Sequence, residues 1–361
     1  MPVKALSGRV TIEDVAATVG VSVATVSYAF NRPDQLSSAL RKHILTTGKR
    51  LGYRGANPVA RNLRRQRTGS IGVLFDESLR YAFADSAASL FLQGVAQATE
   101  EENFGLLLVS CTKQLGEINV INAAVDGFLV YGVPRNDARV LAAKSRRLPL
   151  VFVDHGGVRK AASIEIADRK GAREAAEHLV KLGHSKVAVV SFRLWANPAN
   201  QFVSIEQQGR ATLWPSRERL FGYREALHGS WERHVRVFQC VHSSIANGLI
   251  AAEALLRSDL SFTGLLAMSD VLAIGVIEGL QNAGLKIPQD MSVVGFDDIP
   301  ESQLVRPALT TVHQDHSQKG LQAGRRLIAS ILSNGTAIEL GSIAEPYLVV
   351  RNSTCSAKRA R

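Results

Sequence analysis

The stretch from Val10 to Asn31 has the pattern of two short helices joined by a tight turn. Thr11 can cap the first helix, because its hydroxyl can accept a hydrogen bond from the backbone of Asp14 while the Asp14 carboxylate reaches back. Gly20 ends this helix, since glycine readily takes the left-handed conformation that a helix C-terminus needs. Ser22 then caps a second helix. Two capped helices with so short a connection are typical of a helix-turn-helix motif.

The second helix divides into an inward and an outward face. Val26, Ala29 and Phe30 can pack inward against the first helix. The outward face carries small, hydroxyl-bearing and aromatic side chains without an acid. This composition suits the major groove of DNA, because small residues allow close approach and their methyl groups can touch thymine. A third helix, capped by Ser37 or Ser38, is expected to follow.

A basic segment follows these three helices. Asn57 and Pro58 predict a helix start, because Asn is a good cap and Pro fits the first helical position. This helix could run only about two turns, which is too short to be stable alone in water, so it should fold against a partner. Leu63 lies between Arg61 and Arg64, and an apolar wedge flanked by cations can open a base step in a minor groove. The alternative role for Leu63 is that of a core leucine.

The segments TIEDVAATVGVSVATVSYAFN, LGY and PVARNL resemble the LacI/GalR family of bacterial transcription regulators, and the resemblance continues more loosely to near residue 350. It implies a homodimer on a pseudo-palindromic DNA operator, with base contacts from Val23, Ala24 and Tyr28 and with Leu63 as an intercalating leucine in paired hinge helices. Residues 53–57 carry one residue more than the commonest family spacing. The predicted DNA-contacting residues are Thr11, Ser22, Val23, Ala24, Thr25, Ser27, Tyr28, Asn31, Asn57, Arg61, Leu63 and Arg64.

The positive charge of the chain is concentrated in this head. The formal net charge is +11, and residues 1–70 hold twelve Lys or Arg and three Asp or Glu, a net charge of +9. The last four residues add three cations, and the rest of the chain is nearly neutral. A basic head on a neutral body is the electrostatic pattern of nucleic-acid binding. A three-helix packing or dimerisation module, the alternative for this head, does not require that pattern.

The three cysteines, Cys111, Cys240 and Cys355, lie far apart. Their odd number and wide spacing predict neither a disulfide framework nor a metal site. No signal peptide opens the sequence, and no apolar run is long enough to span a bilayer. We therefore expect a protein of a reducing cytoplasm that uses no metal or cofactor, and the resemblance given above implies a bacterial protein associated with the nucleoid.

From Ser70 onward, short apolar runs alternate with helical stretches. Continuous apolar strands separated by helices predict parallel sheets with helices on both faces. A second such series begins near Ile164, which predicts two Rossmann-like lobes with a cleft between them. This body also resembles the periplasmic-binding-protein-like core of the same family. The expected fold class is therefore an all-α helix-turn-helix domain followed by a two-lobed α/β body.

The expected domain boundaries follow from these patterns. They are a DNA-binding headpiece at 1–56, a hinge helix and linker at 57–69, and an effector-binding and dimerisation body at 70–352. Lobe 1 is expected at about 70–164 and 316–340, and lobe 2 at about 165–312 and 343–352. Residues 192–215 fit neither lobe and predict a lid or an ornament near the cleft. Residues 353–361 are expected to form a disordered tail.

Ligands of open α/β sheets bind beyond the carboxyl ends of the strands, and here those ends carry carboxylates, aromatic rings and hydroxyls. Arg219 stands where the family pattern R-L-x-G-Y implies a ligand-binding arginine. Carboxylates and a guanidinium beside aromatic rings suit a polyhydroxylated ligand, because each Asp can accept two hydroxyls and ring faces stack on C–H groups. The predicted effector contacts are Asp76, Tyr81, Phe83, Tyr131, Asp154, Phe192, Arg219, Ser269, Asp270 and Asp297.

Plainer roles are open to several of these residues. An Asp that follows a strand is often only the cap of the next helix, which applies to Asp270 and Asp297. Arg219 could be a solvated charge on a helix.

Three functions account for these features to different extents. A repressor whose operator affinity is controlled by a small molecule, a sugar or a related metabolite, accounts for both head and body. A solute-binding protein without a DNA-reading role accounts for the body alone. An enzyme of the doubly wound class is not expected, because no G-x-G-x-x-G follows the first strand and no G-x-x-x-x-G-K-[ST] loop is present.

Overall fold

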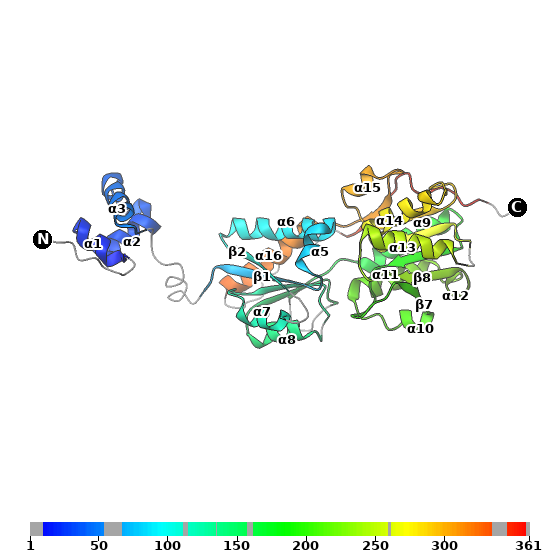
Figure 1. Ribbon diagram of the computed structural model, residues 1–361, viewed down its shortest axis with the longest axis horizontal. Helices are drawn as coiled ribbons and strands as arrows, with labels where there is room; N and C mark the ends of the chain where they lie inside the picture. The colour runs from blue at the N-terminus through cyan, green and yellow to red at the C-terminus, as the bar shows by residue number, and fades with distance from the viewer. Residues whose placement is uncertain are drawn as a thin grey trace. The chain divides into compact units, whose positions relative to one another are not determined.

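The computed structural model describes residues 10–53, 67–110, 115–134, 136–156, 162–258, 261–333 and 345–358. They belong to two compact units, Met1–Thr68 and Gly69–Arg361 (Figure 1). The predicted hinge residues Asn57, Arg61, Leu63 and Arg64 lie outside the described residues, as does Cys111. In the described part of the chain, every helix is too short or too polar to cross a membrane.

The first unit contains α1 (Ile12–Val19), α2 (Val23–Asn31), a 3-10 turn η1 (Pro33–Gln35) and α3 (Ser38–Leu51). Thr11 and Asp14 form the predicted capping box, and Gly20 ends α1 with a φ of 76°. Val15, Val26, Ala29 and Ile44 are completely buried between the helices. Tyr53, beyond α3, packs edge-on against Phe30, with ring centroids 5.4 Å apart. The helix-turn-helix prediction is confirmed.

Lobe 1 of the second unit is a parallel sheet of β1 (Ser70–Phe75), β2 (Gly105–Val109), β3 (Phe128–Tyr131), β4 (Leu150–Val153) and β5 (Ala162–Ile164), in the order β2-β1-β3-β4-β5. Its helices are α5 (Leu79–Ala84), α6 (Ser86–Glu101), α7 (Gly116–Asn122), α8 (Ala138–Ser145) and α16 (His316–Leu332). One apolar core joins the sheet to α6 and α16, and another joins its opposite face to α7 and α8.

Lobe 2 has the strand order β12-β11-β10-β9-β6-β8-β7. Its strands are β6 (Val187–Ser191), β7 (Gln201–Val203), β8 (Val235–Gln239), β9 (Gly264–Ala267), β10 (Ser292–Asp297), β11 (Thr310–His313) and β12 (Tyr347–Val349). Only the edge strands β7 and β12 pair antiparallel with their neighbours among these strands. The expected parallel α/β architecture is therefore confirmed.

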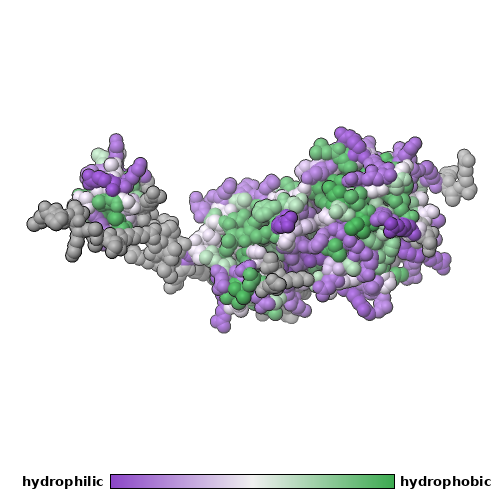
Figure 2. Space-filling view, in the orientation of Figure 1, coloured by the Kyte–Doolittle hydropathy of each residue, from purple (hydrophilic) through white to green (hydrophobic). Residues whose placement is uncertain are grey.

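The helices of lobe 2 cover both faces of this sheet. They are α9 (Asp168–Lys181), α10 (Ile205–Gln208), α11 (Trp214–Ala226), α12 (Trp231–His234), α13 (Ile245–Leu256), α14 (Asp270–Asn282) and α15 (Glu301–Leu304). α9 and α11 pack on one face, and α13 and α14 on the other. Figure 2 shows hydrophobic surface over the region of α13 to α15. The exposed large apolar side chains of these helices include Ile245, Ile250, Leu256 and Leu304.

The chain crosses between the lobes from β5 to α9, from β11 to α16, and from α16 to β12. The middle crossing returns the chain to lobe 1, where α16 lies directly against α6 (Figure 1). Gly94 and Gly320 allow this close approach. A Cβ atom at Gly94 would lie 1.9 Å from the carbonyl oxygen of Ser317, and one at Gly320 would lie 2.0 Å from that of Phe91.

Residues 192–215, for which a lid and an ornament were both open, extend the edge of lobe 2. β7 pairs with β8 through Gln201 to Val203, and Leu194 is fully buried. The backbone N–H of Leu194 donates to Oε1 of Gln239 at 2.9 Å. The segment is thus held to the sheet by its own hydrogen bonds.

The expectation of a disordered tail is wrong for residues 353–358. Ser353 is completely buried, and the backbone N–H of Val293 donates to its carbonyl oxygen at 2.8 Å. The Ala357 N–H donates to the carbonyl oxygen of Leu182 at 2.8 Å. These contacts are made mainly by backbone and hydroxyl groups, so the polar sequence gave no apolar signal of them.

Candidate functional sites

The outward face of α2 is available to a partner. Val23 and Tyr28 are each 42% exposed, Ser22 and Ala24 are exposed, and Thr25 and Ser27 are half-buried. The Ser22 hydroxyl accepts from the Thr25 N–H at 3.1 Å and lies 2.8 Å from the Thr25 hydroxyl, so it caps the helix. Thr11 is exposed, and its hydroxyl donates to Asp14 at 2.9 Å. The side chain of Asn31 lies outside the described residues.

A cavity of about 160 Å³ lies between the two lobes of the body, at the carboxyl ends of their strands. Eight of the ten predicted effector contacts line it: Asp76, Tyr81, Tyr131, Asp154, Phe192, Arg219, Ser269 and Asp297. Its polar lining also includes Glu77, Asp85, Arg193, His242, Ser243, Gln314, His316 and Lys319, which the sequence did not single out.

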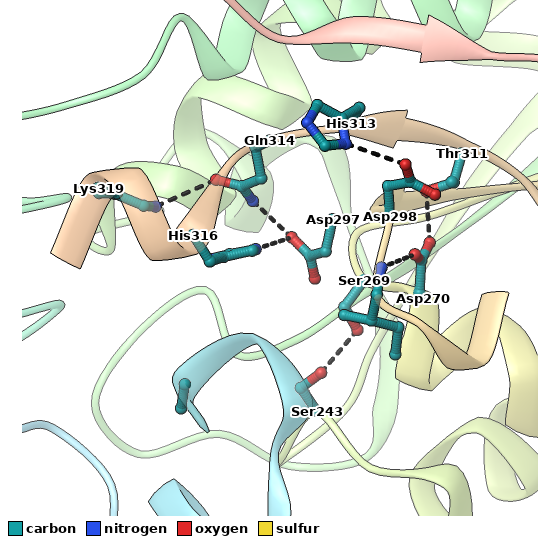
Figure 3. Close-up of polar contacts among 12 residues, drawn as sticks. Ser243, Ser269, Asp270, Asp297, Asp298, Thr311, His313, Gln314, His316 and Lys319 are labelled. Carbon is teal, nitrogen blue, oxygen red and sulfur yellow. Dashed lines mark hydrogen bonds and ion pairs between the residues drawn. The ribbon is translucent and has the colours of Figure 1, made fainter. Parts of the chain in front are cut away.

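Two predicted contacts do not face the cavity, and both predictions are wrong. Phe83 is 66% exposed, because α5 turns it away from the side that carries Tyr81. Asp270 is completely buried, where its carboxylate accepts hydrogen bonds from the Ile299 N–H at 3.0 Å and the Thr311 hydroxyl at 2.5 Å (Figure 3). Burial, followed by the nearby Asp297 carboxylate, raises the pKa of Asp270.

Arg219 enters the cavity wall from α11 and is only 5% exposed, so it is not a solvated helix charge. Its Nε donates to the Asp168 carboxylate at 2.8 Å, and its Nη1 donates to the Met268 carbonyl oxygen. The guanidinium carbon lies 3.6 Å from the centroid of the Phe296 ring. These contacts fix the orientation of Arg219. They also link it to Asp168, the first residue of α9, which follows the crossing from β5 of lobe 1 into lobe 2.

A second set of polar contacts occupies the crossing from β11 to α16 (Figure 3). Nζ of Lys319 donates to Asp154 at 2.7 Å and to Oε1 of Gln314 at 3.1 Å. Nε2 of Gln314 donates in turn to Oδ1 of Asp297 at 2.5 Å. His316 lies 3.5 Å from the same Asp297 oxygen. A hydrogen-bonded chain therefore runs from Asp154 in lobe 1 to Asp297 in lobe 2.

Burial and the neighbouring polar groups shift the pKa of the Asp297 carboxyl in opposite directions. Burial disfavours its ionised form, but the contacts with His316 and Arg219 together outweigh burial and lower the pKa of Asp297. Across the cavity, burial raises the pKa of Asp85, and the Asp297 charge adds to that effect. Asp85 accepts a hydrogen bond from the Tyr81 hydroxyl at 3.0 Å.

Ion pairs between residues of the cavity lining join the two lobes. Asp76 of lobe 1 accepts from Arg139 of the same lobe at 2.8 Å and also pairs with Arg193 of lobe 2. Arg193 lies 3.2 Å from Glu77, which in turn lies 3.4 Å from His242 of lobe 2. We call Asp76, Glu77, Arg193 and His242 the interlobe clasp.

The lining residues that the sequence did not single out were missed for two different reasons. Gln314 and Lys319 follow β11, so the rule that ligands bind beyond the carboxyl ends of strands also applies to them. Arg193 and His242 face lobe 1 only because the lobes approach each other, which no local pattern encodes. Among the described residues, no group of three or more His, Cys, Asp or Glu could hold a metal ion.

The fold and these sites define a class: a helix-turn-helix DNA-binding unit carried by a two-lobed, periplasmic-binding-protein-like body with an interlobe cavity. Residues 11–55 match the model of the bacterial regulatory proteins of the lacI family, and residues 176–354 match a periplasmic binding protein-like domain. The chain is 38% identical over 342 residues to an HTH-type transcriptional regulator of Mycobacterium tuberculosis, covering 92% of this chain and 94% of the relative. The chain belongs to the LacI family and is a DNA-binding transcriptional regulator, not an enzyme.

Solved structures support the same assignment. The lac repressor dimer bound to operator and the anti-inducer ONPF superposes with a TM-score of 0.76 at 25% identity, covering 96% of this chain and 100% of that one. The complex of the regulator CelR with cellobiose superposes with a TM-score of 0.68 at 26% identity, with the same coverage.

Proposed function

We propose that this regulator is a repressor whose operator affinity is controlled by a small polyhydroxylated metabolite, a sugar or a close relative, bound between the lobes. The observation that carries this proposal is the hydrogen-bonded chain from Asp154 through Lys319 and Gln314 to Asp297. A ligand that contacts both aspartates contacts both lobes. Its binding therefore favours one relative orientation of the lobes over another, which is what an allosteric effector must do.

The chemistry of the lining supports a ligand rich in hydroxyl groups. Carboxylate oxygens of Asp154 and Asp297 and the hydroxyls of Ser243 and Ser269 line the same cavity as the rings of Tyr131 and Phe192. Polar groups of this kind fix a ligand's orientation, while aromatic faces pack against its C–H surface. The CelR–cellobiose complex, a relative with a bound disaccharide, supports the same ligand class.

We propose that the working form is a homodimer on a pseudo-palindromic operator, acting at the DNA of a bacterial cytoplasm. The lac repressor, to which this chain is similar, binds its operator as a dimer. The exposed apolar side chains of α13 and α15 supply hydrophobic surface for such an assembly. Val23, Ala24 and Tyr28 on α2 would read bases, with Ser22, Thr25, Ser27 and Asn31 mainly on the backbone. The hinge segment from Asn57 to Arg64 would enter the minor groove.

The first test is the selection of DNA from random duplexes by the full chain at two salt concentrations. A pseudo-palindromic site with an affinity that falls steeply with salt is expected, because phosphate contacts release counterions. Selection of no sequence would contradict the proposal.

The second test adds candidate sugars to the selected operator. A ligand that binds the body should change operator affinity by about tenfold or more, which corresponds to about 1.4 kcal/mol of coupling. Asp297→Asn should abolish this change, whereas Glu206→Gln, an exposed carboxylate on α10, should leave it intact. A ligand that binds without altering operator affinity would refute effector control.

A further inference from the structure

We propose that the cavity takes an uncharged, hydroxyl-rich ligand and excludes the phosphate ester of that same ligand. The proposal rests on the effector role proposed above and narrows the class of effector. It follows from how the charged groups of the lining are already paired.

Each permanent cation that lines the cavity, among the described residues, is held by a carboxylate of the protein. Arg219 pairs with Asp168 at 2.8 Å. Lys319 pairs with Asp154 at 2.7 Å. Arg193 pairs with both Asp76 and Glu77 of the interlobe clasp. A phosphate group would have to displace one of these carboxylates to gain a cation. Asp154 or Asp168 would then be left buried without its cation, whereas Asp76 would keep its ion pair with Arg139.

The two histidines of the lining are also directed at carboxylates. His316 lies 3.5 Å from Asp297, and His242 lies 3.4 Å from Glu77. The lining carries five carboxylates, Asp76, Glu77, Asp85, Asp154 and Asp297, against the three permanent cations Arg193, Arg219 and Lys319. A phosphate monoester carries about −1.5 to −2 charges at pH 7. It would therefore meet an excess of like charge.

What the lining lacks is a donor for Asp154. Oδ1 of Asp154 is buried and, within the described part of the chain, has no hydrogen-bond partner, while Oδ2 accepts from Lys319. A buried acceptor without a donor costs stability, so a ligand hydroxyl at this position would be favourable. At Asp154 an ammonium group is a poorer match than a hydroxyl, because Lys319 already pairs with this carboxylate. At Asp297 the place of a cation is likewise taken, because Nη1 of Arg219 lies 3.6 Å from its Oδ1.

The test uses the intrinsic tryptophan fluorescence of the full chain. Trp195, Trp214 and Trp231 are its three tryptophans, and all lie in lobe 2. The basic head contains no tryptophan. A phosphate compound that binds to the head therefore has no tryptophan beside it whose fluorescence it could change directly. Glucose, galactose and ribose are titrated in parallel with their terminal phosphate esters and with glucosamine.

We expect the neutral sugar that binds to do so at least about 100-fold more tightly than its ester, a difference of about 2.7 kcal/mol. An ester that binds within about tenfold of its parent, or glucosamine binding more tightly than glucose, would overturn the proposal. Asp85→Asn should reduce the difference in affinity between the neutral sugar and its phosphate ester, because it removes one negative charge from the lining. Asn can still cap α6. Glu100→Gln, on the same helix but away from the cavity lining, is the matched control.

Inorganic phosphate, titrated into the tens of millimolar, makes the test independent of the choice of sugar. No saturable fluorescence change is expected, and that result supports the exclusion of anions even if none of the sugars binds. A saturable change that disappears in Arg193→Met would locate a phosphate in the cavity and overturn the proposal. Failure of the proposed function would look different, namely ligand binding without any effect on operator affinity.

Discussion

Replacing Lys319 by Met should destabilise the body more than any exposed charge replacement on the same helix. Lys319 is 1% exposed, and its ammonium group lies 2.7 Å from Asp154. Methionine retains most of the side-chain volume but leaves the Asp154 carboxylate buried without its cation. Removing one member of a buried pair costs about 3–5 kcal/mol. Because a native domain is stable by only about 5–15 kcal/mol, this loss is a large share of the total.

The measurement is urea unfolding followed by circular dichroism at fixed protein concentration. Arg325→Met is the control on α16, since Arg325 pairs with Glu101 at 2.9 Å with 41% of its side chain exposed. Such exposed pairs contribute at most about 1 kcal/mol. The double variant Asp154→Asn/Lys319→Met should recover most of the stability, because no charge is left unpaired. Asn also suits the φ of 52° at position 154. A loss below about 1 kcal/mol for Lys319→Met, or a double variant as unstable as the sum of the singles, would refute this reasoning.

Four further predictions concern the head, the cavity wall and the tail. Tyr28→Ala should change base preference at one position of each half-site in a selection from random duplexes; an unchanged preference would exclude Tyr28 from base reading. Replacing Arg61 or Arg64 by Gln should weaken binding to every sequence and flatten its salt dependence, measured by titration at several salt concentrations. Burial raises the pKa of Asp168 to about 6 against the opposing effect of Arg219. In Arg219→Gln, this carboxyl loses its cation and binds a proton more readily than in the unfolded chain. Without Arg219 the pKa of Asp168 lies above the value that it has beside the guanidinium, so the variant's stability should fall as pH rises from about 4, the ordinary carboxyl pKa, to above about 6. A pH-independent change in melting temperature would contradict this. Deleting residues 353–361 should lower the melting temperature, whereas deleting only 359–361 should not.

The head could be predicted almost residue by residue because its signals are local. Capping at Thr11 and Ser22, the glycine stop at Gly20 and the buried Val26 each depend on neighbours within one or two turns. The strands and helices of the body were predictable for the same reason, from runs of apolar residues.

The cavity was predictable only as far as single strand ends determine it. Asp76 and Asp297 end strands and line the cavity, as expected. Asp270 also follows a strand, but its carboxylate faces Ile299 and Thr311 instead of the cavity. Arg193 faces the cavity because lobe 1 supplies the clasp carboxylates opposite it. That arrangement depends on how two separate sheets meet, and sequence periodicity carries no information about it.

The position of α16 has a consequence for synthesis on the ribosome. Arg325 of α16 pairs with Glu101 of α6 across 224 residues of sequence, so lobe 1 lacks its central helix until nearly the whole of lobe 2 has been made. Synthesis of the 224 residues from Glu101 to Arg325 takes roughly 10–45 s at about 5–20 residues per second. The head, built from local contacts, can fold long before then. A nascent or prematurely terminated chain thus gains a folded DNA-reading unit well before it gains the lobes that would regulate it.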